Sequence, residues 1–297
     1  MLTAKIRELA EKNGIDILEF GDASEFGNYS PDSARRNPAS SLNDAKSIIV
    51  AGIYIGGLSL PFWNDQHYGR TSRLYMSGYF LDAAKPLIPI ASFLKDQGYE
   101  AMICDGSENA TSVLPLKLAA VRCGLGWQGK NSLLVTKKFG SYLALGGIIT
   151  NAFLESNSGQ EPDYCGKCNK CTAACPMSAL DKPYTLNRQR CLSYQLQVPE
   201  LSDEGSLISE NRVADCEICQ DVCPWNQKHL EHPIQTKLTI SFQEQADKLR
   251  NFYRLTDLEN LSEVEYKLES QRLHTDIPFA NFKRNVKIAL GHIHYNF

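Results

Sequence analysis

Cysteine spacing is the feature that most constrains this chain. The first of two cysteine runs reads C-x2-C-x2-C-x3-C-P and extends from Cys165 to Pro176. The second reads C-x2-C-x3-C-P, extends from Cys216 to Pro224, and has one cysteine fewer. Cys191 lies between the runs and is the candidate for the missing ligand. The first spacing is the one by which thiolates hold a [4Fe–4S] cluster, so the sequence predicts two clusters with four cysteines each.

The two runs share their ligands in a predictable way. In two-cluster proteins the cysteine before the proline binds the other cluster. Loops with two intervening residues are short enough to follow one corner of a cubane, and proline ends the turn because it has no N–H to donate. The predicted ligands are Cys165, Cys168, Cys171 and Cys223 for cluster 1, and Cys175, Cys191, Cys216 and Cys219 for cluster 2.

Two other uses of cysteine fit this sequence less well. Zinc ribbons also use C-x2-C pairs, but the two C-x3-C-P endings argue against them. A disulfide framework is typical of small secreted domains, whereas this chain has 297 residues and no mark of secretion. Cys104 and Cys123 lie outside the runs, and for them a buried, inert thiol is the default interpretation.

Composition indicates a globular, cytoplasmic protein. The chain is 43% hydrophobic, which allows a sizeable core, and its formal net charge is −3. No global basic excess points to nucleic acid, although a local patch is compatible with this charge. Residues 1–14 are charged and lack the apolar region of a signal peptide, and no apolar run approaches the length of a membrane span.

Hydrophobic patterning predicts an α+β fold in three consecutive parts. An α/β domain is expected over 1–155, the cluster domain over 156–235, and a helical tail over 236–297. The near-continuous apolar segment 47–55 suits the middle of a covered sheet. Helices are expected over 2–13, 79–95 and 112–123, strands over 15–20 and 99–104, and a hairpin of strands 132–136 and 141–149.

A glycine-rich segment is the second signal. Residues 124–131 read G-L-G-W-Q-G-K-N and follow a predicted helix. Glycines permit close approach of a ligand to the backbone, and Lys130 and Asn131 carry groups that bind phosphate or amides. The order helix, glycines, strand is the reverse of a dinucleotide-binding turn. Without further context a tight loop around a buried Trp127 is an equal alternative.

The glycine-rich segment and the cysteine runs together resemble the epoxyqueuosine reductase family, which is itself similar to the catalytic part of reductive dehalogenases. The resemblance covers most of the chain from about residue 46 and is most specific over 124–226. It implies a nitroreductase-like α/β domain that holds base-off cobalamin, followed by a ferredoxin-like domain with two [4Fe–4S] clusters. Electrons from an external donor, such as ferredoxin or flavodoxin, would pass through both clusters to cob(I)alamin. The implied corrinoid-binding residues are Gly124, Gly126, Trp127, Gly129, Lys130, Asn131 and Ser132.

The chain departs from the family where a general acid is expected. An aspartate upstream of the glycine-rich segment is proposed as the acid in that family, and here the aligned position is Ala110. Asp105 and Glu108 are the nearest carboxylates, and Tyr142 is a further candidate proton donor. His67 is interpreted as a loop residue.

Function therefore stays open between two classes. One is a monomeric reductase that uses cobalamin and two clusters. Its substrate is either epoxyqueuosine in tRNA or a smaller molecule that enters an altered pocket. The case for tRNA is weakened by the missing acid, by the net charge, and by the lack of the helical repeats with which family members grip tRNA. The other is an electron-transfer or corrinoid-handling protein that has no tRNA substrate.

Overall fold

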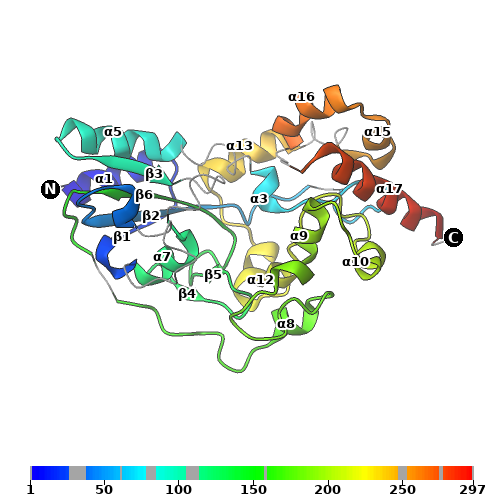
Figure 1. Ribbon diagram of the computed structural model, residues 1–297, viewed down its shortest axis with the longest axis horizontal. Coiled ribbons are helices and arrows are strands. Elements are labelled where there is room, and N and C mark those ends of the chain that lie inside the picture. The colour runs from blue at the N-terminus through cyan, green and yellow to red at the C-terminus, as the bar shows by residue number, and fades with distance from the viewer. Residues whose placement is uncertain are drawn as a thin grey trace. The chain divides into compact units, whose positions relative to one another are not determined.

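The computed structural model describes most of the chain as mixed helices and sheet (Figure 1). Contacts divide it into two compact units that are each discontinuous in sequence. The first unit comprises 1–54, 79–129 and 133–166, and the second comprises 55–78, 130–132 and 167–297. The described residues are 2–26, 38–60, 62–77, 85–104, 114–156, 159–246, 253–273 and 277–295.

An antiparallel sheet of four strands organises the first unit. Its order is β1 (Ile17–Asp22), β2 (Ser47–Tyr54), β6 (Leu143–Thr150) and β3 (Ala101–Cys104). Every residue of β2 is buried. This confirms the prediction that the apolar segment 47–55 forms the middle of a covered sheet.

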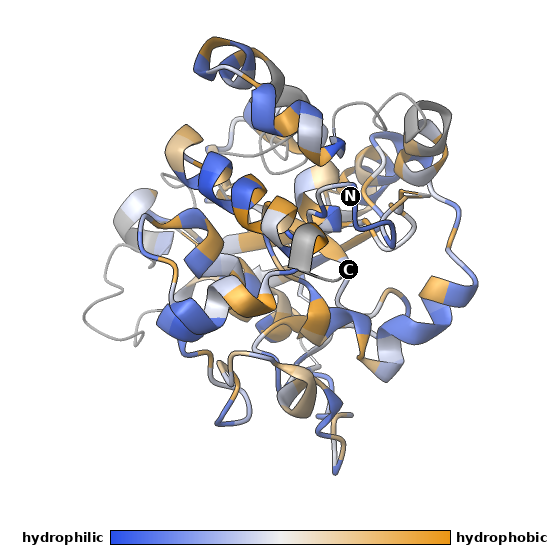
Figure 2. Cartoon of the chain, turned by 90° about the vertical axis from the view of Figure 1, so that its right-hand side faces the viewer, coloured by the Kyte–Doolittle hydropathy of each residue, from blue (hydrophilic) through white to orange (hydrophobic). Residues whose placement is uncertain are grey.

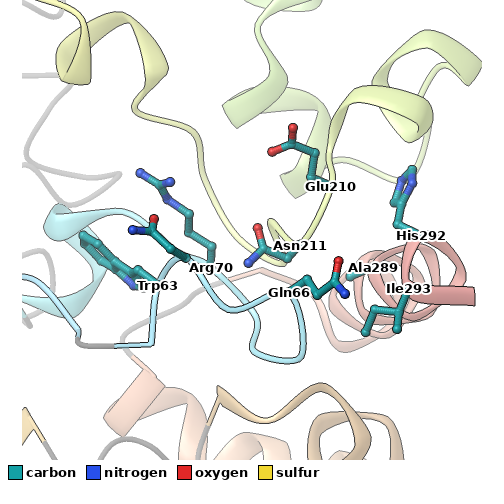
Figure 3. A pocket seen from close by; sticks show the side chains of 9 residues that line it. Trp63, Gln66, Arg70, Glu210, Asn211, Ala289, His292 and Ile293 are labelled. Atoms are coloured by element: carbon teal, nitrogen blue, oxygen red, sulfur yellow. The ribbon is translucent and has the colours of Figure 1, made fainter. Parts of the chain in front are cut away.

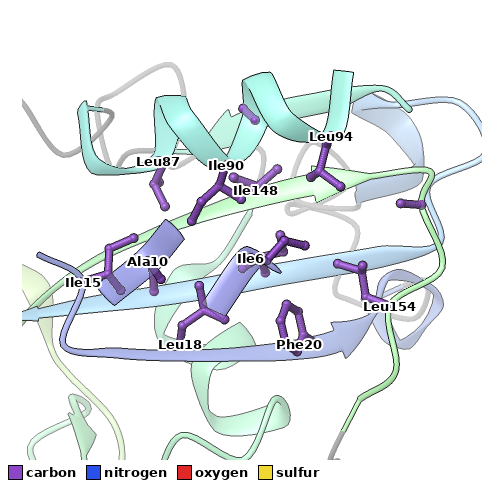
Figure 4. Packing of buried hydrophobic residues seen from close by; sticks show 14 residues of the cluster. Ile6, Ala10, Ile15, Leu18, Phe20, Leu87, Ile90, Leu94, Ile148 and Leu154 are labelled. Atoms are coloured by element: carbon purple, nitrogen blue, oxygen red, sulfur yellow. The ribbon is translucent and has the colours of Figure 1, made fainter. Parts of the chain in front are cut away.

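Hydrophobic clusters cover both faces of this sheet. On one face, Ile49 and Ala51 belong to a cluster with residues of α1 (Leu2–Lys12) and α5 (Ile88–Asp96). Figure 4 shows Ile6 of α1 and Ile90 of α5 in this cluster. On the other, Ile48 and Val50 pack against α7 (Leu116–Arg122). Because side chains alternate along a strand, a strand that is buried at every position supplies both clusters. The unit also contains η1 (Ala23–Phe26), α2 (Pro38–Ser41) and η3 (Lys85–Leu87).

The predicted hairpin of 132–136 with 141–149 is wrong. The short strand β5 (Leu134–Val135) pairs with β4 (Trp127–Gln128), and β6 lies between β2 and β3. A bridge between Thr136 and Gly140 still closes the tight turn that suggested the hairpin. The chain leaves the turn without continuing the ladder because pairing with β2 and β3 buries β6 in the main sheet.

Helix ends also differ slightly from expectation. The helix expected over 112–123 begins at Leu116, with Pro115 as its N-cap, and the predicted cap Ser112 lies outside the described residues. Of the helix expected over 79–95, residues 79–84 lie outside the described part, and η3 precedes α5 in the remainder. Gly14 has φ +82° after α1, as expected of a helix-ending glycine.

Short helices make up the second unit, and they confirm the predicted helical tail. Asn285 of α17 (Phe279–Tyr295) donates hydrogen bonds to Leu196 O at 2.9 Å and Val213 O at 3.0 Å, which ties the tail to the segment between the cysteine runs. The helices are α3 (Arg73–Met76), α8 (Lys170–Ala174), η4 (Arg188–Arg190), α9 (Leu192–Gln197), α10 (Asp203–Ile208), α11 (Ile218–Asp221), α12 (Pro224–Glu231), α13 (Lys237–Ala246), α15 (Leu255–Asn260), α16 (Glu263–Leu273) and α17 (Phe279–Tyr295).

The helices mix hydrophilic and hydrophobic residues along their length (Figure 2). Among the described residues, none of them is long and apolar enough to span a bilayer.

Candidate iron–sulfur and cofactor site

The first cysteine run folds as a turn that leads into a single helical turn. α8 carries Cys171 and ends at Cys175, after which Pro176 blocks its continuation. The amide of Ala179 points back at Cys175 Sγ at 3.3 Å. An N–H directed at sulfur stabilises negative charge there, which suits a thiolate ligand.

The second run repeats this local structure. α11 carries Cys219, and Cys223 is the N-cap of α12, whose first position is Pro224. The amide of Cys216 donates to Asp215 Oδ1 at 2.7 Å, which fixes the entry to the run. Two runs with similar spacing thus form similar turns, as the sequence led us to expect.

Cys191 lies at the N-cap of α9, among the cysteines predicted to share its cluster. Burial raises the pKa of Cys191, and negative charge on Asp215 and Cys175 raises it further. Burial raises the pKa of Cys216 to about 12, and charge on Cys191 contributes. Burial raises the pKa of Cys219 well above its usual value, and charges on nearby cysteines add to this effect. Those cysteines are Cys216, Cys191, Cys175 and Cys171.

These four predicted ligands of cluster 2 therefore lie near one another in a partly buried region, with Cys171 of the other set also near. Gathering thiolates there without a cation is unfavourable, and a bound cluster would supply the positive charge that keeps them deprotonated. The donor set fits an iron–sulfur cluster in chemistry. Within the described ranges, no three His, Cys, Asp or Glu side chains already stand in a preformed metal-ligand arrangement.

The glycine-rich segment is shaped first by packing. Gly124 has φ +78° and ends α7. A Cβ on Gly126 would lie 2.1 Å from Val135 O, so this glycine is required by the close approach of β4 and β5. Trp127 is 2% exposed and contacts Tyr164 edge-on at 5.0 Å between ring centroids. Of the two interpretations of this segment, a ligand-binding loop or a tight loop around a buried tryptophan, the second describes residues 124–127.

The next three residues contact the cysteine runs. Lys130 Nζ donates to Cys168 O at 2.8 Å, and Asn131 Nδ2 donates to Cys219 O at 3.4 Å. Ser132 has φ +64°, and its buried hydroxyl has no hydrogen-bond partner within the described part of the chain. A buried orphan hydroxyl is unfavourable, so Ser132 fits a residue that contacts a ligand.

The catalytic candidates are only partly placed. Asp105, Glu108 and Ala110 lie outside the described residues. Tyr142 is fully buried in the first unit, so its role as a proton donor stays a prediction. His67 is exposed in a loop, where its amide donates to Asp65 Oδ1 at 3.0 Å. Cys104 and Cys123 are buried, as expected of inert thiols.

Sequence reasoning missed a buried ionic cluster beside the second run. Arg73 pairs with Glu217, and Arg73 Nη1 lies 3.0 Å from Asp221 Oδ1. Arg70 Nη2 lies 2.8 Å from Asp221 Oδ2. Burial raises the pKa of Glu217 to about 7, while Arg73 opposes that shift. The signal available in the sequence was two acidic residues interleaved with the cysteines of 216–223.

A pocket of about 350 Å³ opens beside Arg70 (Figure 3). Trp63 and Arg70 line it from one segment, and Glu210 and Asn211 from another. His292 of α17 also lines it, and its Nε2 lies 2.9 Å from Ser206 O.

The comparisons agree with the cysteine pattern. Residues 164–226 match the model of a 4Fe-4S double cluster binding domain. An epoxyqueuosine reductase of Lactococcus garvieae is 34% identical over 235 residues, which cover 72% of this chain and 61% of that protein. One of Prochlorococcus marinus is 39% identical over 134 residues, which cover 44% of this chain and 43% of that protein. The chain thus spans less than two thirds of the length of these relatives.

Solved structures extend the similarity to nearly the whole chain. The epoxyqueuosine reductase of Streptococcus thermophilus superposes with a TM-score of 0.80 at 26% identity, covering 98% of this chain and 81% of that one. A catabolic reductive dehalogenase shares the fold, with a TM-score of 0.55 at 17% identity over 95% of this chain and 36% of that one. By these similarities the chain belongs to the epoxyqueuosine reductase family.

Proposed function

We propose that this chain is an iron–sulfur oxidoreductase that reduces epoxyqueuosine in tRNA with the help of cobalamin. The observation that carries the proposal is the set of cysteines over 165–223, within a chain that aligns with epoxyqueuosine reductases over 98% of its length. A solved relative is an epoxyqueuosine reductase with an epoxyqueuosine-modified tRNA stem loop. We assign the same class of substrate to this protein.

The cluster ligands are assigned as the sequence predicts. Cluster 1 takes Cys165, Cys168, Cys171 and Cys223, and cluster 2 takes Cys175, Cys191, Cys216 and Cys219. The second set is supported by the electrostatic effect of Cys175 on Cys191, of Cys191 on Cys216, and of all three on Cys219, although Cys171 of the first set also acts on Cys219. The carbonyls of Cys168 and Cys219 accept hydrogen bonds from Lys130 and Asn131, which orient the turns.

Base-off cobalamin is assigned to the surroundings of residues 124–132. When bound, the corrinoid supplies a low-valent cobalt centre for the reduction. Ser132 offers its orphan hydroxyl to a polar group of the ligand, and Lys130 and Asn131 hold the backbone beside it. A solved dehalogenase with the same fold is associated with B12-dependent dehalogenation, which is the reason for choosing a corrinoid.

The remaining assignments follow the family. Asp105 or Glu108 serves as general acid in place of Ala110. A low-potential donor such as ferredoxin or flavodoxin supplies electrons, and the protein acts in the cytoplasm as a monomer.

Anaerobic reconstitution followed by metal analysis and UV–visible spectroscopy tests this proposal. About eight iron and one cobalt per chain are expected from two cubane clusters and a corrinoid. C191S is expected to lose about half of the iron, while C104S, which alters a buried cysteine outside the cluster set, retains it all.

Substrate turnover is the second measurement. Reconstituted protein with dithionite is expected to convert epoxyqueuosine in a tRNA stem loop. Whichever of D105N and E108Q removes the general acid is expected to slow that conversion at least about 100-fold. Full iron without cobalt would replace the proposal by an electron-transfer protein. Cobalt without turnover would replace it by a corrinoid-handling protein.

A further inference from the structure

Four charged side chains of the second unit form what we call the ionic clamp: Arg70, Arg73, Glu217 and Asp221. Arg73 and Glu217 are only 5% and 3% exposed, and Arg70 and Asp221 are 19% and 23% exposed. Both guanidinium groups also lie over the ring of Trp63, at 5.4 Å for Arg70 and 5.0 Å for Arg73. Ions buried to this extent depend strongly on their partners, since an unpaired charge there is very unfavourable.

The clamp joins a distant segment to the second cysteine run. Glu217 directly follows Cys216 and precedes α11, which carries Cys219. Glu217 accepts both from the Arg73 side chain and from the Arg73 amide, the latter at 3.0 Å. Asp221 ends α11. The carboxylates of the clamp therefore lie within the run, and its guanidinium groups come from 70–73.

We propose that the ionic clamp sets the reduction potential of the cluster held by Cys216 and Cys219. The inference rests on the proposed function because it needs a cluster there. The clamp carries two positive and two negative charges, so intact it adds little net charge beside the cluster. Reduction adds one electron to the cluster, and in a buried region that electron interacts with any uncompensated charge over several ångströms.

Removing either partner of the central pair therefore has an effect of predictable sign. R73M leaves the ionic clamp with two carboxylates and one guanidinium group, because Arg70 and Asp221 remain, and the net negative charge opposes the added electron. E217Q leaves it with two guanidinium groups and one carboxylate, and the net positive charge favours the added electron. The other charges that act on Cys216, from Arg212 and Asp215, remain in both variants.

The test is a mediated redox titration of the reconstituted protein. Electron paramagnetic resonance spectroscopy measures the reduced cluster at each potential. The signal to follow is the one that disappears in C191S. R73M is expected to lower the equilibrium constant for one-electron reduction about tenfold, a shift of about 59 mV, and E217Q to raise it about tenfold. The R73M/E217Q double variant is expected to return within about threefold of the parent.

Shifts of the reduction potential in opposite directions distinguish an electrostatic effect from structural damage. Distortion of the fold gives no reason for R73M and E217Q to shift the potential in opposite directions. The control E263Q/K267M removes an exposed ion pair of α16 and is expected to leave the potential unchanged. If a buried variant fails to fold, R70M and D221N remove the more exposed partners and are expected to shift the potential with the same signs, by less. Equal potentials, or shifts of one sign, in variants with full iron content would overturn the inference. Absence of iron in the parent protein would overturn the proposed function instead.

Discussion

Gly126 lies in a glycine-rich segment that suggests ligand binding, yet in the structure close packing of the backbone is what requires a glycine there. Its α-carbon faces the backbone of β5, and an added Cβ would lie 2.1 Å from Val135 O. A backbone oxygen cannot move aside as a flexible side chain does. An alanine at position 126 would therefore push β4 and β5 apart. Val135 is 1% exposed, and separation would also disturb the core around it.

G126A is therefore expected to lower the free energy of unfolding by about 1–3 kcal/mol, the usual range for overpacking a filled interior. Denaturant unfolding of the reconstituted protein measures it. G159A is the matched control, since no atom lies within 4 Å of a Cβ there. Equal stability of the two variants would show that the contact between β4 and β5 relaxes freely.

Asp16 makes the stability of the first unit depend on pH. Burial raises the pKa of Asp16, although its carboxylate accepts the amide of Tyr54 at 2.7 Å and Lys138 lies near. With a raised pKa, the folded state holds the proton more tightly than the unfolded state does. This contribution is present below the unfolded pKa and is lost as the pH rises through the folded pKa.

D16N is accordingly expected to flatten the loss of stability as the pH rises above about 4, the ordinary pKa of an aspartate, while keeping an acceptor for Tyr54. Urea midpoints across this pH range provide the measurement. D22N, on the exposed end of β1, is the control. A D16N curve parallel to that of the parent would exclude this source of pH dependence.

Helix α17 illustrates how an element far along the chain supports the cysteine region. Asn285 is 1% exposed and satisfies the carbonyls of Leu196 and Val213. Arg284 adds hydrogen bonds to Val198 O and Pro199 O. The tail thus donates hydrogen bonds to backbone carbonyls of the short helix α9 and its C-terminal end, and of the segment before the second cysteine run.

N285A is expected to destabilise the protein by about 2 kcal/mol, because the carbonyl of Val213 loses the Asn285 donor and that of Leu196 keeps only Arg284. Thermal unfolding of the reconstituted protein measures the loss. K287A, on an exposed position of the same helix, is expected to stay within about 0.5 kcal/mol of the parent. Similar losses in both variants would mean that helix propensity rather than these hydrogen bonds is limiting.

At the same scale, the elements show what could be predicted from the sequence. β2 and α1 were predictable because each carries a complete local pattern of apolar residues. The partner of β6 was not, because a turn at 137–140 is a local signal while pairing with β2 joins residues about a hundred positions apart. The same limit hid the pair Arg73–Glu217, which are separated by 144 residues. The cysteine turns were predictable because their spacing is itself local.

The whole molecule combines two units with different means of stabilisation. The first has a sheet with apolar clusters on both faces. In the region of the cysteine runs, the described hydrophobic cluster is small, with Met177, Leu192 and Leu196 fully buried. Core packing alone therefore supplies less stabilisation there, and we expect cluster binding to contribute folding free energy, as metal binding does in small metal-dependent domains.

Removal of iron is accordingly expected to act unevenly along the chain. Hydrogen exchange of protein treated anaerobically with chelator and oxidant, compared with reconstituted protein, is expected to show faster exchange over about 167–231. Amides of β2 and β6 are expected to keep their protection, because their hydrogen bonds lie in a sheet covered on both faces. C104S, which leaves the predicted ligands intact, should respond to iron removal as the parent does. A uniform rise in exchange across both regions would instead mean that the two units unfold as one cooperative structure and that the clusters stabilise the sheet as much as the turns that bind them.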